Sequence, residues 1–129
     1  MSKSQKKTPA NLIWFEIPAD KPARAQKFYR ELFGWKINAM PGMADYWHID
    51  TGGEDGMPDG GLMPRMHPGH TITNYINVPS VTRAMAKVKK LGGKICKPKT
   101  AVPTMGYLAI CQDTEKNTFA LWEINMKAK

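Results

Sequence analysis

The chain has 129 residues, a formal net charge of +8 and 42% hydrophobic residues, a length and composition that predict a single domain with its own core. Its apolar residues never form a run close to the roughly 18 residues of a membrane-spanning helix. No apolar segment follows the charged start MSKSQKKTPA, so we predict a cytoplasmic protein whose residues 1–10 form a short disordered tail.

The first elements predicted after this tail are a strand, a helix and a second strand. Residues 12–17 are rich in branched and aromatic side chains, which predicts a strand that Pro18 ends. Asp20 is the expected N-cap of a helix that Gly34 terminates. One helix face would carry the apolar residues Ala25, Phe28, Tyr29, Leu32 and Phe33. Residues 35–37 begin the second strand.

The next segments complete a first module of about residues 11–66. Residues 44–51 alternate and are aromatic, which predicts a strand. The glycine-rich residues 52–60 are expected to form a loop, and residues 61–65 a short strand. MHPGH, residues 66–70, is a connector.

A second module, about residues 71–125, repeats the order of the first. Residues 71–78 predict a strand, and Ser80 is the expected cap of a helix whose inner face carries Val81, Ala84, Met85, Val88 and Leu91. Three extended segments follow, at residues 94–96, 105–112 and 118–125. A single unit of this kind leaves one face of its sheet uncovered, so we predict that two units pair within one domain, residues 11–125.

The net charge raises the question of nucleic-acid binding, because basic proteins are attracted to phosphate. Many of the lysines lie in the two tails and between Lys87 and Lys99. No aromatic or arginine residues alternate with them as they do in proteins that read single strands or grooves. Solvated lysine faces are therefore predicted, and neither nucleic acid nor a membrane is an expected partner.

Three segments resemble the vicinal oxygen chelate superfamily, which includes glyoxalase I, bleomycin-resistance proteins and extradiol dioxygenases. They are WFEIPADKPARAQKFYRELFGW, NVPSVTRAMAKVKKLGGKICKPKT and GYLAICQDTEKNTFALWE, and together they cover most of residues 11–124. The resemblance implies an α+β fold in which two βαβββ modules form a curled mixed sheet around a cleft. It also implies a homodimer that completes the cleft.

The resemblance further implies where metal-using members hold their divalent ion. Trp14, Thr73 and Ala120 occupy three of the ligand positions, and the fourth falls near Met63. Tryptophan, alanine and methionine offer no hard lone pair, and threonine is a weak neutral ligand. The usual metal site is therefore predicted to be missing, and no cofactor is expected.

A displaced metal site is the alternative. His67 and His70 are three residues apart in a predicted loop, and His48 lies in a predicted strand. With Glu16 they would offer ligands for Zn, Ni, Fe or Mn. The same spacing around Pro-Gly is also typical of a solvated loop.

Glu16 is the candidate catalytic residue, because it lies two residues after Trp14 and so shares its strand face. It would act as a base or hold a cationic ligand; a structural pairing with a lysine or arginine is the other possibility. By the same alternation, the predicted ligand-binding set is Trp14, Glu16, Thr73, Tyr75, Asn77, Ala120 and Trp122. Its aromatic members would line a site for a flat molecule or belong to the core.

Two functional hypotheses follow from these observations. The first is a metal-free protein of the bleomycin-resistance type that binds a small molecule. The second is an enzyme related to glyoxalase or the dioxygenases, a lyase or oxidoreductase, that uses the displaced metal site. The metal content of the purified protein separates the two.

Overall fold

The computed structural model describes residues 10–54 and 58–129. The predicted tail, apart from residue 10, and three residues of the predicted glycine-rich loop lie outside the described residues. The chain forms two compact units: Ile13–Tyr75, and Ile76–Lys129 together with the described residues before Ile13. No helix in the described ranges is long and apolar enough to cross a membrane.

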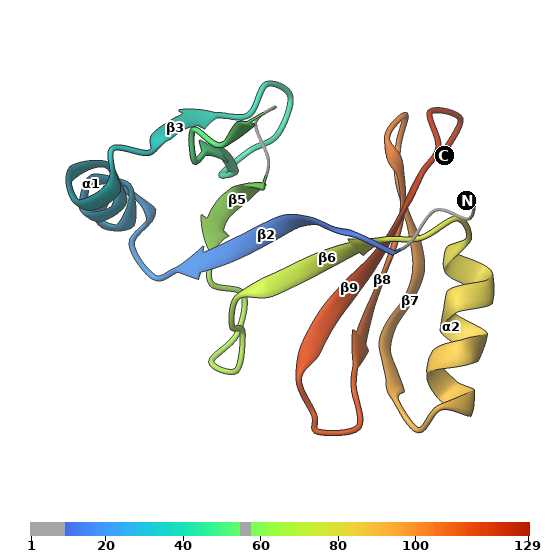
Figure 1. The fold of residues 1–129 in the computed structure, drawn as a ribbon. Helices are drawn as coiled ribbons and strands as arrows, with labels where there is room; N and C mark the ends of the chain where they lie inside the picture. The colour runs from blue at the N-terminus through green and yellow to red at the C-terminus, as the bar shows by residue number, and fades with distance from the viewer. Residues whose placement is uncertain (1–9, 55–57) are drawn as a thin grey trace. The chain divides into compact units, whose positions relative to one another are not determined.

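The first module has the order strand, helix and three strands (Figure 1). Its elements are β2 (Leu12–Ala19), α1 (Pro22–Phe33), β3 (Lys36–Ala39), β4 (Trp47–Asp50) and β5 (Asp59–Pro64). The strands lie in the order β3-β4-β5-β2, followed by β6 (Thr73–Asn77). β2 and β5 are parallel, whereas β3–β4 and β4–β5 are antiparallel.

The second module continues from β6 with the same order. Its remaining elements are α2 (Val81–Lys90), β7 (Lys94–Val102), β8 (Gly106–Gln112) and β9 (Thr118–Ile124). These three strands form an antiparallel meander, and α2 packs against it (Figure 1). The predicted α+β class, the two βαβββ modules and the mixed sheet are thus confirmed.

The sheet of the first unit has an apolar face, which α1 covers. Its buried side chains are Ile17, Ala19, Ile37, Ile49 and Leu62. Ala25 and Tyr29 of α1 pack against this cluster. Because successive residues of a strand point to opposite faces, the residues between these positions lie on the other face.

The predicted start of α1 is wrong in one respect. Lys21, not Asp20, is the N-cap, and it makes no side-chain cap bond. Asp20 instead accepts a hydrogen bond from Arg65 Nε at 2.9 Å. β2 also continues through Pro18, because the backbone N–H of Arg65 donates to the carbonyl of Ala19, beyond the proline.

Other boundaries shift by a few residues. β4 begins at Trp47 because residues 41–45 form turns, and β5 begins at Asp59 rather than at residue 61. β7 continues past residue 96, through Pro98, to Val102. Its pairing with β8 shifts register on either side of Lys97, as at a β-bulge. The predicted inner face of α1 is only partly buried, since Phe28, Leu32 and Phe33 are each more than half exposed.

The ends of both helices follow from local chemistry. Gly34 adopts the left-handed conformation (φ 72°) that ends α1, and its N–H donates to Arg30 O. Ser80 Oγ accepts from the N–H of Arg83, as predicted. Glu123 Oε1 also accepts from the N–H of Val81 at 2.9 Å, so β9 supplies a second cap for α2.

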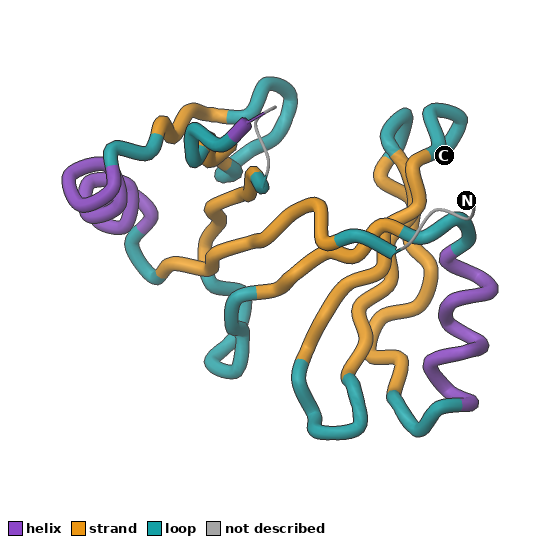
Figure 2. Tube along the Cα trace, in the orientation of Figure 1, coloured by secondary structure: helices purple, strands orange, loops and turns teal. Residues whose placement is uncertain are grey.

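A turn connects β8 and β9 (Figure 2). It is organised by the carboxylate of one residue, Asp113. Asp113 Oδ1 accepts from the backbone N–H groups of Asn117 (2.9 Å) and Glu115 (2.8 Å). These bonds stabilise the ionised form and lower the pKa of Asp113 below its ordinary 3.8.

We expect this turn to weaken in acid. Since the pKa of Asp113 is lower in the folded protein than in the unfolded chain, its stabilisation is present above the unfolded pKa and is lost as the pH falls through the folded pKa. The melting temperature of the parent should therefore fall more than that of Asp113→Asn between about pH 5 and about pH 2. An equal fall of the melting temperature with pH in the two proteins would contradict this role of Asp113.

Candidate functional site

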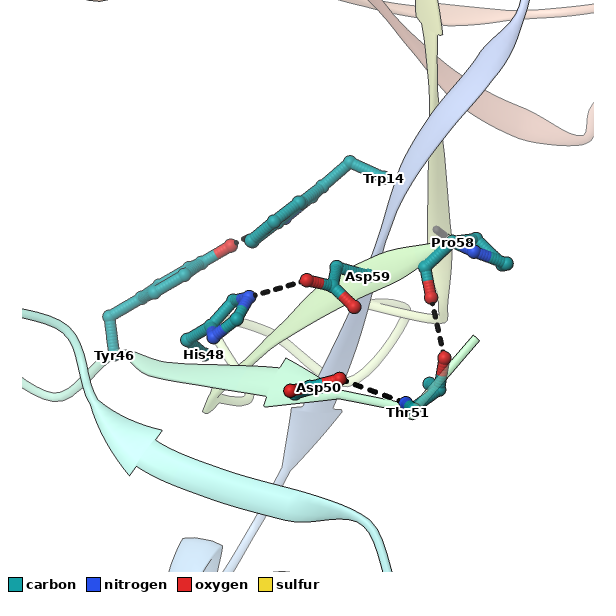
Figure 3. Close-up of polar contacts among 8 residues, drawn as sticks. Trp14, Tyr46, His48, Asp50, Thr51, Pro58 and Asp59 are labelled. Carbon is teal, nitrogen blue, oxygen red and sulfur yellow. Dashed lines mark hydrogen bonds and ion pairs between the residues drawn. The ribbon is translucent and has the colours of Figure 1, made fainter. Parts of the chain in front are cut away.

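Three neighbouring strands bring the candidate site together on the face of the first unit that is turned away from α1. Along the strands, Trp14 pairs with Asp59, and Glu16 pairs with Gly61. Gly61 pairs in turn with His48 of β4. Residues that pair across strands share a face, so the side chains of Trp14, His48 and Asp59 lie together (Figure 3), on the same face as Glu16.

Glu16 is held by two tyrosines. Tyr46 Oη donates to Glu16 Oε2 at 2.6 Å, and Tyr75 Oη donates to Oε1 at 3.0 Å. Burial, and then the charge of Glu16, raise the pKa of both tyrosines above the ordinary value. Both hydroxyls therefore stay protonated and donate. Among the described residues, Glu16 pairs with these two tyrosines and not with a lysine or arginine.

Gly61 makes room for Tyr46. A Cβ added at Gly61 would lie 2.6 Å from Cε1 of Tyr46 and closer still to its Cζ and Oη. No real Cβ tolerates such contacts, so only glycine lets the phenol lie across β5 and reach Glu16. The absence of a side chain at this position is thus part of the site.

Trp14 extends the network toward β4 and β5. Its Nε1 donates to Tyr46 Oη at 3.0 Å, and its ring stacks on His48 with centroids 5.7 Å apart (Figure 3). His48 Nε2 lies 2.8 Å from Asp59 Oδ2. Asp59 Oδ1 is buried without a hydrogen-bond partner among the described residues. The unused acceptor Asp59 Oδ1 therefore lies beside the stacked rings of Trp14 and His48.

His67 and His70 stack on each other in the connector before β6, with centroids 5.5 Å apart. His70 Nδ1 accepts from the N–H of Met66 at 3.1 Å. Burial, and next the neighbouring His67, lower the pKa of His70. At neutral pH the imidazole of His70 is therefore uncharged.

The displaced metal site is not assembled as a cluster. Within the described ranges, no three side chains of His, Cys, Asp or Glu gather closely enough to hold a metal ion. His48 pairs with Asp59, and His67 pairs with His70. Glu16 is engaged by tyrosines instead.

The positions at which the family resemblance implies metal ligands do not fit a hard divalent ion here. The indole N–H of Trp14 is a donor and is already used. Thr73 is buried and its hydroxyl donates to Thr71 O. Ala120, in the second unit, is fully buried and offers no ligand atom, and Met63 has only a thioether.

The predicted ligand-binding set divides between the two units. Trp14, Glu16, Thr73 and Tyr75 belong to the first. Asn77, Ala120 and Trp122 belong to the second, where the Trp122 ring covers Gly106, 2.8 Å from the position of an added Cβ. The candidate site is therefore defined by residues of the first unit.

Sequence reasoning missed three members of the site: Tyr46, Asp59 and Gly61. Tyr46 was expected within a strand, and the other two at the end of a loop and the start of the next strand. Their roles depend on how β2, β5 and β4 are aligned. The available signal was the glycine pair at residues 60–61, since adjacent glycines in a strand indicate a close approach of another group.

Comparisons with known proteins agree with this architecture. Residues 11–52 match the model of the bleomycin resistance protein-like N-terminal family. The chain is 33% identical over 112 residues, 82% of its length and 88% of the relative's, to a glyoxylase-like domain-containing protein of Didymella fabae. The chain therefore belongs to the glyoxalase/bleomycin resistance/dioxygenase superfamily.

Solved structures show the same fold at low identity. A member of this superfamily from Vibrio splendidus 12B01 matches with a TM-score of 0.65 and 12% identity, over 91% of this chain and 100% of that one. The hypothetical protein BH1468 of Bacillus halodurans C-125 matches with a TM-score of 0.67 and 14% identity, over 95% and 99%. These likenesses concern the fold alone.

Proposed function

We propose that this protein binds a small, partly aromatic molecule without the divalent metal used by many of its relatives. The observation that carries the proposal is Glu16, which two neutral tyrosine hydroxyls fix in place on the face of the sheet turned away from α1. Trp14 provides aromatic surface beside it. A few placed polar groups within aromatic surroundings are typical of ligand sites.

A metal-free site is supported by the chemistry of the residues present. Trp14, Met63, Thr73 and Ala120 stand where metal-using relatives have ligands, and none is a strong ligand for a hard ion. The alternative, a glyoxalase- or dioxygenase-like enzyme, would need His48, His67, His70 and Glu16 to converge on one ion. The placement of these side chains does not favour it.

Elemental analysis and ligand screening test the proposal together. Protein grown with added Zn, Ni, Fe or Mn should purify without stoichiometric metal. In a thermal-shift screen of aromatic molecules, hits should stabilise the parent, and Trp14→Ala should remove the effect. One tightly held ion per chain that His48→Ala releases would favour the enzyme. If Trp14→Ala reduced the stabilisation by none of the hits, the proposed site would be rejected.

A homodimer is part of the same proposal. Phe28, Leu32 and Phe33 form an exposed apolar strip on α1, each 56–58% exposed. Apolar surface of this kind on a small domain is available for a self-complementary interface. The prediction of a homodimer rests on this strip and on the family resemblance.

A further inference from the structure

We infer that the molecule bound at this site is an organic ammonium ion and that Glu16 supplies the opposite charge. The inference rests on the proposed function and names the class of its ligand. It comes from the charges around Glu16, the free acceptor sites of its carboxylate and the aromatic groups beside it.

Glu16 has no positively charged partner among the described residues. The described ion pairs of lysine and arginine are Lys27–Glu31 and Arg65–Asp20, and His48 contacts Asp59; none of these includes Glu16. The two tyrosines that bind Glu16 are neutral donors, so they fix the carboxylate but leave its charge in place. A half-buried charge without a counter-ion is costly, and a cationic ligand would relieve that cost.

The groups nearest to Glu16 do not neutralise it. His70 lies within electrostatic reach of Glu16, but its lowered pKa leaves it uncharged at neutral pH. The charge of Arg65 also lowers the pKa of His70. The guanidinium of Arg65 donates hydrogen bonds to Asp20 and to the carbonyl of His70. Asp59 lies two positions along the neighbouring strand from Gly61, which pairs with Glu16, and it adds a further carboxylate. Within the described residues, the Glu16 carboxylate thus lacks a cationic partner in a chain whose net charge is +8.

The carboxylate retains capacity to accept. An ionised carboxylate has about four lone-pair sites, and each oxygen of Glu16 accepts one hydrogen bond from a tyrosine. The remaining lone pairs can accept from an ammonium N–H or lie against an alkylated nitrogen. Both tyrosine hydroxyls hold the carboxylate before the ligand arrives, so little ordering is required on binding.

The surrounding aromatic groups favour an organic cation over a metal ion. Trp14, Tyr46 and Tyr75 all meet at or beside the Glu16 carboxylate. Aromatic rings attract ammonium groups and also contact their alkyl substituents. A hard metal ion would instead require several more oxygen ligands.

Calorimetry with three probes of different charge tests this inference. Benzyltrimethylammonium should bind the parent at least about tenfold more tightly than benzyl alcohol, and benzoate should not bind measurably. Glu16→Gln keeps the size of the side chain and removes its charge, so it should weaken benzyltrimethylammonium binding about tenfold and benzyl alcohol binding by much less. Glu31→Gln removes the same charge from an exposed pair on α1 and is the matched control.

The outcomes separate this inference from the proposed function. If benzyl alcohol or benzoate binds as well as the cation, and Trp14→Ala abolishes that binding, the site exists but is not selective for cations. If none of the three probes binds in a way that depends on Trp14, the inference and the proposed site both fail. Should Glu16→Gln not fold, the ranking of the three probes on the parent protein still decides the question.

Discussion

Gly61→Ala should disable the candidate site and destabilise the protein by about 1 to 3 kcal/mol, the usual cost of forcing an extra methyl group into a packed position. The added Cβ would overlap the ring of Tyr46. To escape, Tyr46 must give up its hydrogen bonds to Glu16 and Trp14. Equilibrium unfolding in urea and binding of an aromatic probe measure the two effects.

A double-mutant cycle assigns the effect to this contact. In a Tyr46→Ala background the ring is gone, so adding Gly61→Ala should cost little, whereas Tyr46→Phe should give no rescue because Cζ and Cε1 remain. Gly69→Ala is the matched control, since its nearest neighbour would be His67 Nδ1 at an ordinary 3.6 Å. Additive effects of Gly61→Ala and Tyr46→Ala would show that the two residues do not share this space.

Leu62→Ala should cost about 2 to 5 kcal/mol, the range for a leucine truncated inside a packed core. Leu62 is 0% exposed, pairs with Ile17 and with Trp47, and lies at the centre of the cluster beneath α1. Its neighbours are held by two strand pairings, so they cannot collapse into the cavity. The midpoint of urea unfolding reports the loss.

Leu32→Ala is the comparison for this core substitution. Leu32 is 57% exposed on α1, so its truncation should change stability by less than about 1 kcal/mol. A loss from Leu32→Ala as large as that from Leu62→Ala would mean that something covers this side of α1, as a second copy of the chain would. A nearly neutral Leu62→Ala would contradict the placement of the core.

Local signals predicted the elements well because each end of an element depends on a few adjacent residues. Gly34 and Ser80 end and begin their helices as expected. Asp20 fails as a cap because Arg65, 45 residues away, takes its carboxylate. A local rule cannot include a partner that only strand pairing brings near.

The candidate site was predictable only in part, for the same reason. Alternation along one strand correctly placed Trp14 and Glu16 on one face. It could not reveal that Tyr46 crosses β5 above Gly61, because that contact depends on the alignment of three strands. Alternation therefore left open whether Glu16 serves the site or pairs with a lysine or arginine, and it did not predict the two tyrosines that bind the carboxylate.

The parallel pairing of β2 with β5 affects the order in which parts of the protein fold. β2 ends at Ala19 and β5 begins at Asp59, so the two strands meet only after a long loop has closed, which is slow compared with forming α1 or the β3–β4 hairpin. A slip of β5 by one residue would turn Leu62 outward and Asp59 toward α1. An early intermediate with its helix and hairpin already built would therefore lack the site altogether, and recovery of probe binding during refolding should lag behind recovery of helical signal.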